Sequence, residues 1–200
     1  LERKKKAEMS LQYFKTAKQN NLDNNIADEI LNYFKAFKTI EEYIDEPVLI
    51  EYESENINLV NKIKTSLDNT MNNIIISTDN DEYIINPGKI KTITIKVYNK
   101  FNNKPIRNLP VIIKNVYGKA EFKENYISGE GGKINLIIKP GNYLSKKNVI
   151  QISIDIQSIY ENTKSPLLKA FIKNIYSPKK NISLNIKTPK IFIKSSEYNF

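Results

Sequence analysis

Residues 90–114 read IKTITIKVYNKFNNKPIRNLPVIIK, two apolar stretches on either side of a loop that holds two prolines and four asparagines. In the first stretch Ile93, Ile95 and Val97 alternate with polar residues, and this alternation is the period of a strand with one buried face. The second stretch begins with the β-branched run Val111–Ile113, which favours another strand. The segment therefore predicts two strands of a sheet joined by a crossing loop.

Further short β-type stretches surround this pair and are separated by turns rich in proline, glycine and asparagine. They lie at residues 74–76, 83–85, 120–122, 134–138, 149–159, 182–186 and 191–193. Seven or so short strands at such spacing predict a β-sandwich, with a small barrel as the alternative. Ser165 and Pro166 suit the first positions of a short helix that would interrupt the strands.

The N-terminal third has a helical period instead. Apolar residues recur every three or four positions over residues 2–20, 23–44 and 54–71. We expect the first two segments to form an antiparallel helical hairpin and the third to form a helix capped by Ser54. The fold class is therefore α+β, with a helical unit over residues 1–72 and a sandwich over residues 73–200.

Charge separates the same two parts of the chain. Residues 1–86 hold ten basic and sixteen acidic side chains, and residues 87–200 hold twenty-one basic and six acidic ones, within a total of +9. The net charge therefore changes from −6 in the first segment to +15 in the second, and this difference predicts two units with different surfaces.

The composition excludes several classes of catalytic and metal site. The chain contains no cysteine and no histidine, so disulfides, thiolate metal sites and histidine-based triads are ruled out. We predict a protein that is not an enzyme, with no cofactor and no metal. An enzyme that uses two carboxylates is the remaining alternative. Apolar runs of three or four residues are far too short to cross a membrane.

Two motifs in the second half carry a resemblance to a known fold. The loop NKPIRNLPV at residues 103–111 and the turn GEGGKINL at residues 129–136 are similar to the corresponding elements of bacterial immunoglobulin-like (Ig-like) modules. The resemblance covers about seventy residues and implies an Ig-like antiparallel β-sandwich. It implies no particular function, because such sandwiches serve many roles.

The helical unit carries a second resemblance. Residues 7–44 resemble one degenerate tetratricopeptide (TPR) hairpin, with Phe34 and Ala36–Phe37 near the expected positions and Pro47 following late. A TPR-like hairpin joined to an Ig-like sandwich resembles TPR-motif cell-envelope proteins of Lyme-type spirochaetes. This resemblance implies a periplasmic or membrane-associated protein that complexes another envelope protein and contributes to virulence. Any membrane association is expected to come from a segment that precedes residue 1.

Aromatic side chains of the hairpin are the first candidate site. They are Tyr13, Tyr33, Phe34 and Phe37. One interpretation is packing between the helices and against the sandwich, and the other is a face that docks a partner helix or peptide.

Lysines near the C-terminus are the second candidate site. They are Lys179, Lys180, Lys187, Lys190 and Lys194. Lysines on strands usually form a solvated face that protects sheet edges. The alternative is an adhesin-type module that binds an acidic host polysaccharide or protein. With two arginines in the whole chain and no nucleic-acid motif, no nucleic-acid partner is expected.

Overall fold

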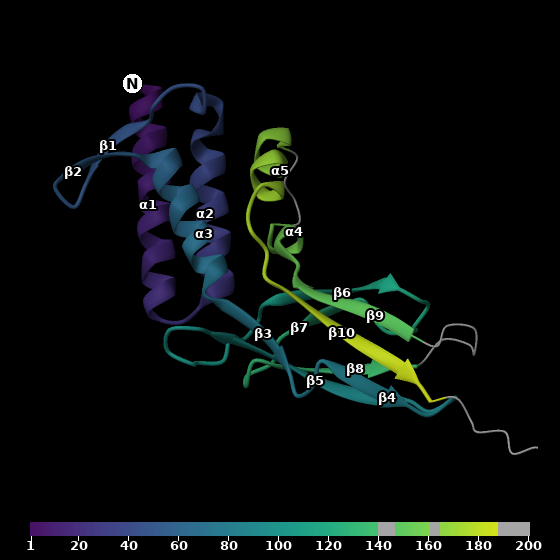
Figure 1. Cartoon of the computed structure of the whole chain (residues 1–200). Coiled ribbons are helices and arrows are strands. Elements are labelled where there is room, and N and C mark those ends of the chain that lie inside the picture. Colours follow the sequence, from purple (N-terminus) through teal and green to yellow (C-terminus); the bar gives the residue numbers. More distant parts are fainter. Residues whose placement is uncertain (140–146, 161–164, 188–200) are drawn as a thin grey trace, which may run out of the picture.

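A computed structural model describes residues 1–139, 147–160 and 165–187. Helices form a bundle, and two packed sheets lie below it in Figure 1. The helices are α1 (Glu2–Leu22), α2 (Ile26–Ile40), the 3₁₀ turn η1 (Glu41–Tyr43), α3 (Leu59–Asn72), α4 (Ile156–Ile159) and α5 (Pro166–Lys173). The strands are β1 (Leu49–Tyr52), β2 (Glu55–Asn58), β3 (Ile74–Thr78), β4 (Glu82–Ile85), β5 (Lys91–Asn99), β6 (Pro110–Tyr117), β7 (Asn125–Ile127), β8 (Lys133–Ile138), β9 (Lys147–Ile154) and β10 (Lys179–Ile186).

The two sheets confirm the predicted α+β class with an Ig-like sandwich. One sheet has the strand order β3-β5-β8, and the other has the order β4-β10-β9-β6-β7. In an immunoglobulin sandwich, strands A, B and E lie in one sheet and strands C, F and G lie in the other. Here β3, β5 and β8 occupy the places of A, B and E, and β6, β9 and β10 occupy the places of C, F and G. Isoleucines that alternate along β5, β8 and β9 point into the space between the sheets, where they are buried.

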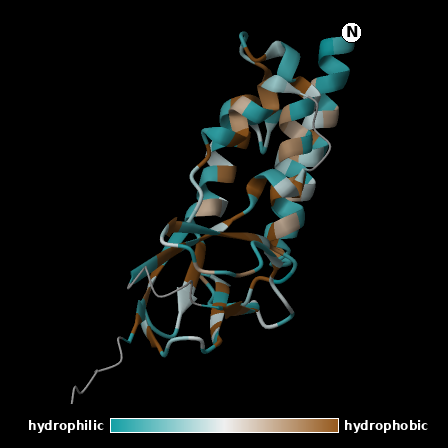
Figure 2. Ribbon diagram, turned by 90° about the vertical axis from the view of Figure 1, so that its right-hand side faces the viewer, coloured by the Kyte–Doolittle hydropathy of each residue, from teal (hydrophilic) through white to brown (hydrophobic). Residues whose placement is uncertain are grey.

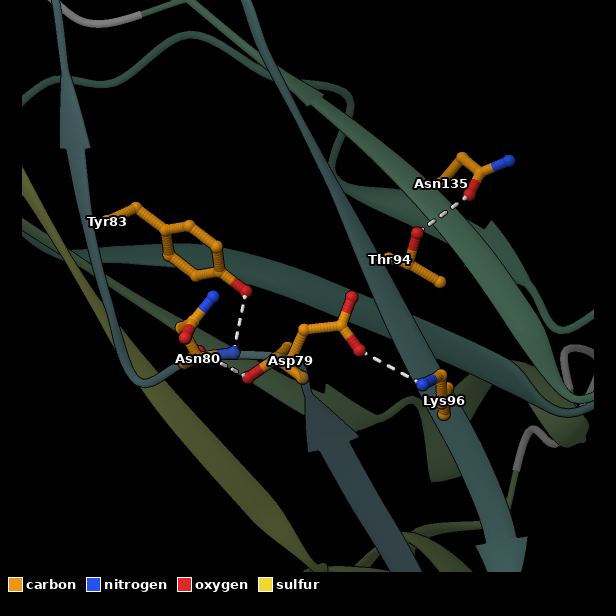
Figure 3. Close-up of polar contacts among 7 residues, drawn as sticks. Asp79, Asn80, Tyr83, Thr94, Lys96 and Asn135 are labelled. Carbon is orange, nitrogen blue, oxygen red and sulfur yellow. Dashed lines mark hydrogen bonds and ion pairs between the residues drawn. The ribbon is translucent and has the colours of Figure 1, made fainter.

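One strand pair departs from the predicted antiparallel arrangement. Strands β4 and β10 run parallel, whereas the other pairs among the described residues are antiparallel. The reason is that the first strand of the sandwich changes sheets at residues 79–81, which places β3 in one sheet and β4 in the other. Figure 3 shows this corner, where Asp79 pairs with Lys96 at 3.0 Å and the Asn80 N–H donates to the Tyr83 hydroxyl at 3.2 Å.

The third helix begins later than the sequence predicts. Residues 49–58 form a β-hairpin, and α3 starts at Leu59 with Asn58, not Ser54, as its N-cap. Two contacts hold the hairpin in place. The Leu59 N–H donates to the Val48 carbonyl at 2.9 Å, and the Tyr52 ring packs edge-on against the Phe14 ring with a centroid distance of 5.5 Å. These are tertiary contacts, so the local helical period gave no sign of them.

Three strand predictions also need correction or lie beyond the described residues. Strand β9 ends at Ile154, and Ile156 opens α4, because the Asp155 carboxylate caps the helix by accepting from the Ser158 N–H at 3.3 Å. In place of a strand at residues 120–122 there is a single bridge between Glu121 and Lys139. The strand predicted at residues 191–193 lies outside the described residues.

The two motifs with Ig-like character pack against each other. Ser128 is buried between them, where its hydroxyl accepts from the Leu109 N–H at 3.0 Å and donates to the Ile106 carbonyl at 2.7 Å. Asn103 and Asn108 adopt left-handed backbone conformations in the crossing loop, and asparagine tolerates this conformation well in turns. Of the glycines in the turn, Gly132 alone has a positive φ.

Helices α4 and α5, inserted between β9 and β10, connect the sandwich to the bundle. The Phe171 ring of α5 stacks on Phe37 of α2 with a centroid distance of 3.9 Å and an interplanar angle of 17°. Nearby, Ser165 and Glu41 are joined by a hydrogen bond. Figure 2 shows hydrophobic positions continuing from the bundle into the sandwich, and the buried apolar residues form one cluster. The division of the chain at residue 72 stays a prediction.

A buried carboxyl lies inside the helical bundle. Glu29 of α2 is 1% exposed and accepts hydrogen bonds from the Thr70 hydroxyl at 2.5 Å and from the Asn21 amide at 2.8 Å. Burial raises the pKa of this carboxyl above its ordinary value of 4.5, although both hydrogen bonds oppose the shift. Burial also raises the pKa of the adjacent Tyr33 hydroxyl.

This buried carboxyl gives a prediction for the pH dependence of stability. Because the pKa of Glu29 is higher in the folded than in the unfolded state, its favourable contribution is complete below the unfolded pKa and is lost as pH rises through the folded pKa. We expect Glu29→Gln to flatten the fall in the free energy of unfolding above pH 4.5, measured by urea denaturation. The exposed Glu82 provides the control Glu82→Gln. Identical pH profiles for wild type and Glu29→Gln would contradict the assignment.

Candidate interaction surface

The aromatic residues predicted to dock a partner are for the most part inside the protein. Tyr33, Phe34 and Phe37 have no exposed surface, and Tyr13 is half-buried. In this structure Tyr33, Phe34 and Phe37 therefore offer no side-chain surface to a partner, and a docking role for the set stays a prediction.

Helix α2 buries these side chains because it has neighbours on several sides. Helices α1 and α3 pack on it from the bundle, and α5 packs on it from the sandwich. The Ser10 hydroxyl of α1 donates to the Ala36 carbonyl of α2 at 2.7 Å, which holds the first two helices close together. The sequence predicted a short helix that begins at Ser165 and Pro166, but it did not show that this helix covers Phe37.

The predicted lysines are divided between different surroundings. Lys179 and Lys187 are exposed, and Lys180 pairs with Asp81 at the corner where the first strand changes sheets. Lys190 and Lys194 lie outside the described residues. Lys179 is thus the member of this set that belongs to a recognisable site.

A groove lies on the outer face of the five-stranded sheet, between β6 and β9 on one side and α5 with the link to β10 on the other. It has a volume of about 710 Å³. We name it the basic groove and define it by Ile112, Lys114, Gln151, Lys173, Tyr176 and Lys179. Figure 1 places α4 and α5 above this face of the sheet.

Strand alternation places these side chains in the groove. On β6, Val111 and Ile113 are buried between the sheets, so Ile112 and Lys114 point to the outer face. On β9, Gln151 likewise points outward and donates to the Asn181 amide oxygen of β10 at 3.1 Å. These contacts give the floor of the groove a fixed position.

The wall of the groove is the segment that leads from α5 to β10. The Ser177 hydroxyl in this segment donates to the Ile154 carbonyl at 3.3 Å, which fastens the wall to β9. Ile175 is buried beneath it, and the Tyr176 ring is 54% exposed at the rim. Lys173 occupies the last turn of α5, where the helix dipole favours a cation.

Positive charge dominates the groove. Lys114, Lys173 and Lys179 are exposed, and none of them forms an ion pair with any described residue. The carboxylate in the lining is that of Asp155, which is engaged as the cap of α4. Three free cations beside an apolar residue and an aromatic ring can bind carboxylates and apolar side chains together.

Two other kinds of site are absent from the described part of the chain. Within it, no three acidic side chains converge in a way that could hold a metal ion. Among its helices, none is both long and apolar enough to traverse a lipid bilayer.

Comparison with known proteins finds distant similarities to solved structures. No protein-family model and no curated protein matches the sequence. Domains 4 and 5 of the S-layer protein SbsC align over 57% of this chain and 51% of theirs, with 11% identity and a TM-score of 0.36. The Yersinia pseudotuberculosis adhesin InvE aligns over 56% of this chain and 32% of its own, with 11% identity and a TM-score of 0.37. WR4, a Caenorhabditis elegans MSP family member, aligns over 56% of this chain and 97% of its own, with 14% identity and a TM-score of 0.36.

The chain thus spans about half the length of the SbsC fragment and about a third of InvE. What defines the class of protein is its own geometry. It is an α+β protein in which an Ig-like sandwich and a helical bundle share an apolar core, with a basic groove on the outer face of the larger sheet.

Proposed function

We propose that this chain is a non-enzymatic interaction module of a bacterial cell envelope, and that its basic groove docks an acidic segment of another protein. The observation that carries the proposal is the set of three exposed lysines without ion-pair partners among the described residues, all lining one groove. The envelope location rests on the resemblance of the TPR-like residues 7–44, joined to the Ig-like motifs at residues 103–111 and 129–136, to spirochaetal cell-envelope proteins.

The chemistry of the groove favours a polypeptide over a polysaccharide. Beside its lysines it presents the partly exposed Ile112 and the exposed ring of Tyr176, which suit apolar side chains. A sugar ring can pack its C–H face on the Tyr176 ring, but a uniformly charged sugar polymer offers no aliphatic side chain to Ile112. A peptide in which acidic and apolar residues alternate would match both parts of the groove.

The test is the binding of fluorescein-labelled deca-glutamate to the full chain, followed by fluorescence anisotropy. We expect Lys114→Gln/Lys173→Gln/Lys179→Gln to weaken binding about tenfold, since three exposed ion pairs of about 0.2–1 kcal/mol each are lost. Raising the salt concentration should weaken wild-type binding as well, because exposed charges are screened.

A matched variant separates the groove from the general positive charge of the protein. Lys89, Lys104 and Lys133 are also exposed on the sandwich and line no part of the groove. Changing these three to glutamine removes the same charge and should weaken binding less than twofold. Equal losses in both variants would refute a specific groove. Equally tight binding of a heparin fragment, with the same dependence on the groove lysines, would refute the preference for polypeptide.

A further inference from the structure

The β1–β2 hairpin carries the opposite charge to the basic groove. Glu51, Glu53 and Glu55 lie on it, all three are exposed, and none forms an ion pair with a described residue. The Glu53 carboxylate next to Tyr52 raises the pKa of the Tyr52 hydroxyl, and burial adds to this shift.

The hairpin projects from the helical bundle. Its tip residues Glu53 and Ser54 both adopt left-handed backbone conformations, which form a tight two-residue turn. The base is anchored by the hydrogen bond from Leu59 to the Val48 carbonyl, and the ring of Tyr52, the last residue before the tip, packs on Phe14. The hairpin is thus held in a fixed position, and it projects to the side of α1 in Figure 1.

The hairpin and the groove face different directions. Figure 1 shows β1 and β2 on the side of the bundle opposite α5, with α1, α2 and α3 between them. The hairpin of one molecule therefore cannot enter the groove of the same molecule. It is accessible to the groove of a second molecule.

We propose, building on the function proposed above, that the acidic segment docked in the basic groove is the β1–β2 hairpin of a second copy of this chain. Three carboxylates of one copy meet Lys114, Lys173 and Lys179 of the next. The exposed Leu49 at the base of the hairpin supplies apolar surface for Ile112 and Tyr176. The contact joins two different surfaces, so it is heterologous, and repeated contacts build a head-to-tail chain of molecules rather than a closed dimer.

The proposal is tested by reversing charges on each surface of the full chain. One variant carries Glu51→Lys, Glu53→Lys and Glu55→Lys, and the other carries Lys114→Glu, Lys173→Glu and Lys179→Glu. In sedimentation velocity at low salt, the mean mass of the wild type should rise with protein concentration. Each variant alone should remain monomeric, because its own groove and hairpin now have the same sign.

Mixing the two variants is the decisive measurement. In the mixture every groove finds a hairpin of opposite charge, so the mean mass should return to that of the wild type at equal concentration. Lys89→Glu/Lys104→Glu/Lys133→Glu is the control and should associate as the wild type does. A mixture that stays monomeric, or a wild type that is monomeric at every concentration, would overturn the proposal. Glutamine versions of the two variants guard against misfolding, and they too should lose at least about tenfold in association.

Deca-glutamate binding distinguishes failure of the self-association proposal from failure of the proposed function. The variant with lysines on the hairpin keeps its groove and should bind deca-glutamate at least as tightly as the wild type. If the wild type binds deca-glutamate but does not self-associate, the groove serves another protein and the hairpin is not its occupant. If deca-glutamate does not bind, both proposals fail.

Discussion

Replacing Phe37 by alanine is expected to lower the free energy of unfolding by about 3–5 kcal/mol. The ring has no exposed surface and lies between the bundle and the Phe171 ring of α5. Removing it leaves a cavity where α2 meets the inserted helix, and the surroundings can close this cavity only in part. Urea denaturation followed by circular dichroism measures the loss.

The same substitution tests how the helical unit and the sandwich are coupled. A double-mutant cycle with Phe171→Ala should give an interaction energy of about 0.5–1.5 kcal/mol, as expected for a stacked aromatic pair. Phe101, which is 81% exposed in the crossing loop, is the control, and Phe101→Ala should change stability by less than about 0.5 kcal/mol. A loss below about 1 kcal/mol for Phe37→Ala would contradict the buried position of its ring.

Replacing Gly132 by alanine is expected to cost about 2–5 kcal/mol, from a strained backbone together with overpacking. Gly132 has φ +64°, and a Cβ there would lie 2.3 Å from the Val97 carbonyl oxygen and 3.1 Å from the Ile106 backbone nitrogen. Both atoms belong to the backbone where the two Ig-like motifs meet, so neither can rotate away. Thermal and urea unfolding of the variant measure the effect.

Gly88 separates the two causes of this cost. Its φ is +69°, but a Cβ there would meet nothing within 4 Å. Gly88→Ala should therefore show the backbone strain alone, about 1–2 kcal/mol. Equal losses at Gly88 and Gly132 would show that the close approach to Val97 has no energetic consequence.

Much of the fold followed from local patterns. The alternation in residues 90–97 and the run at 111–113 became β5 and β6, and the Ser165–Pro166 pair became the start of α5. The β1–β2 hairpin was missed, because Ile57 also fits the helical period that continues through α3. Its strand conformation depends on contacts with α1 that lie far away in the sequence.

The candidate site was less accessible to sequence reasoning. Of the groove lysines, Lys179 was predicted, whereas Lys114 and Lys173 were not. Their signal was present only as the general positive charge of residues 87–200. The TPR-like interpretation of residues 7–44 stays a prediction.

The sequence by itself determined the α+β class, the sandwich and the separation of charge between the two parts of the chain. These follow from periodicity, turn residues and counts of ionisable groups, all of which act over a few neighbouring positions or over the whole composition. Only the tertiary structure decided that Phe37 is buried and that three lysines share one groove. Burial and convergence depend on which distant segments pack together, and the decisive segment here is α5, which lies more than a hundred residues from α2 along the chain.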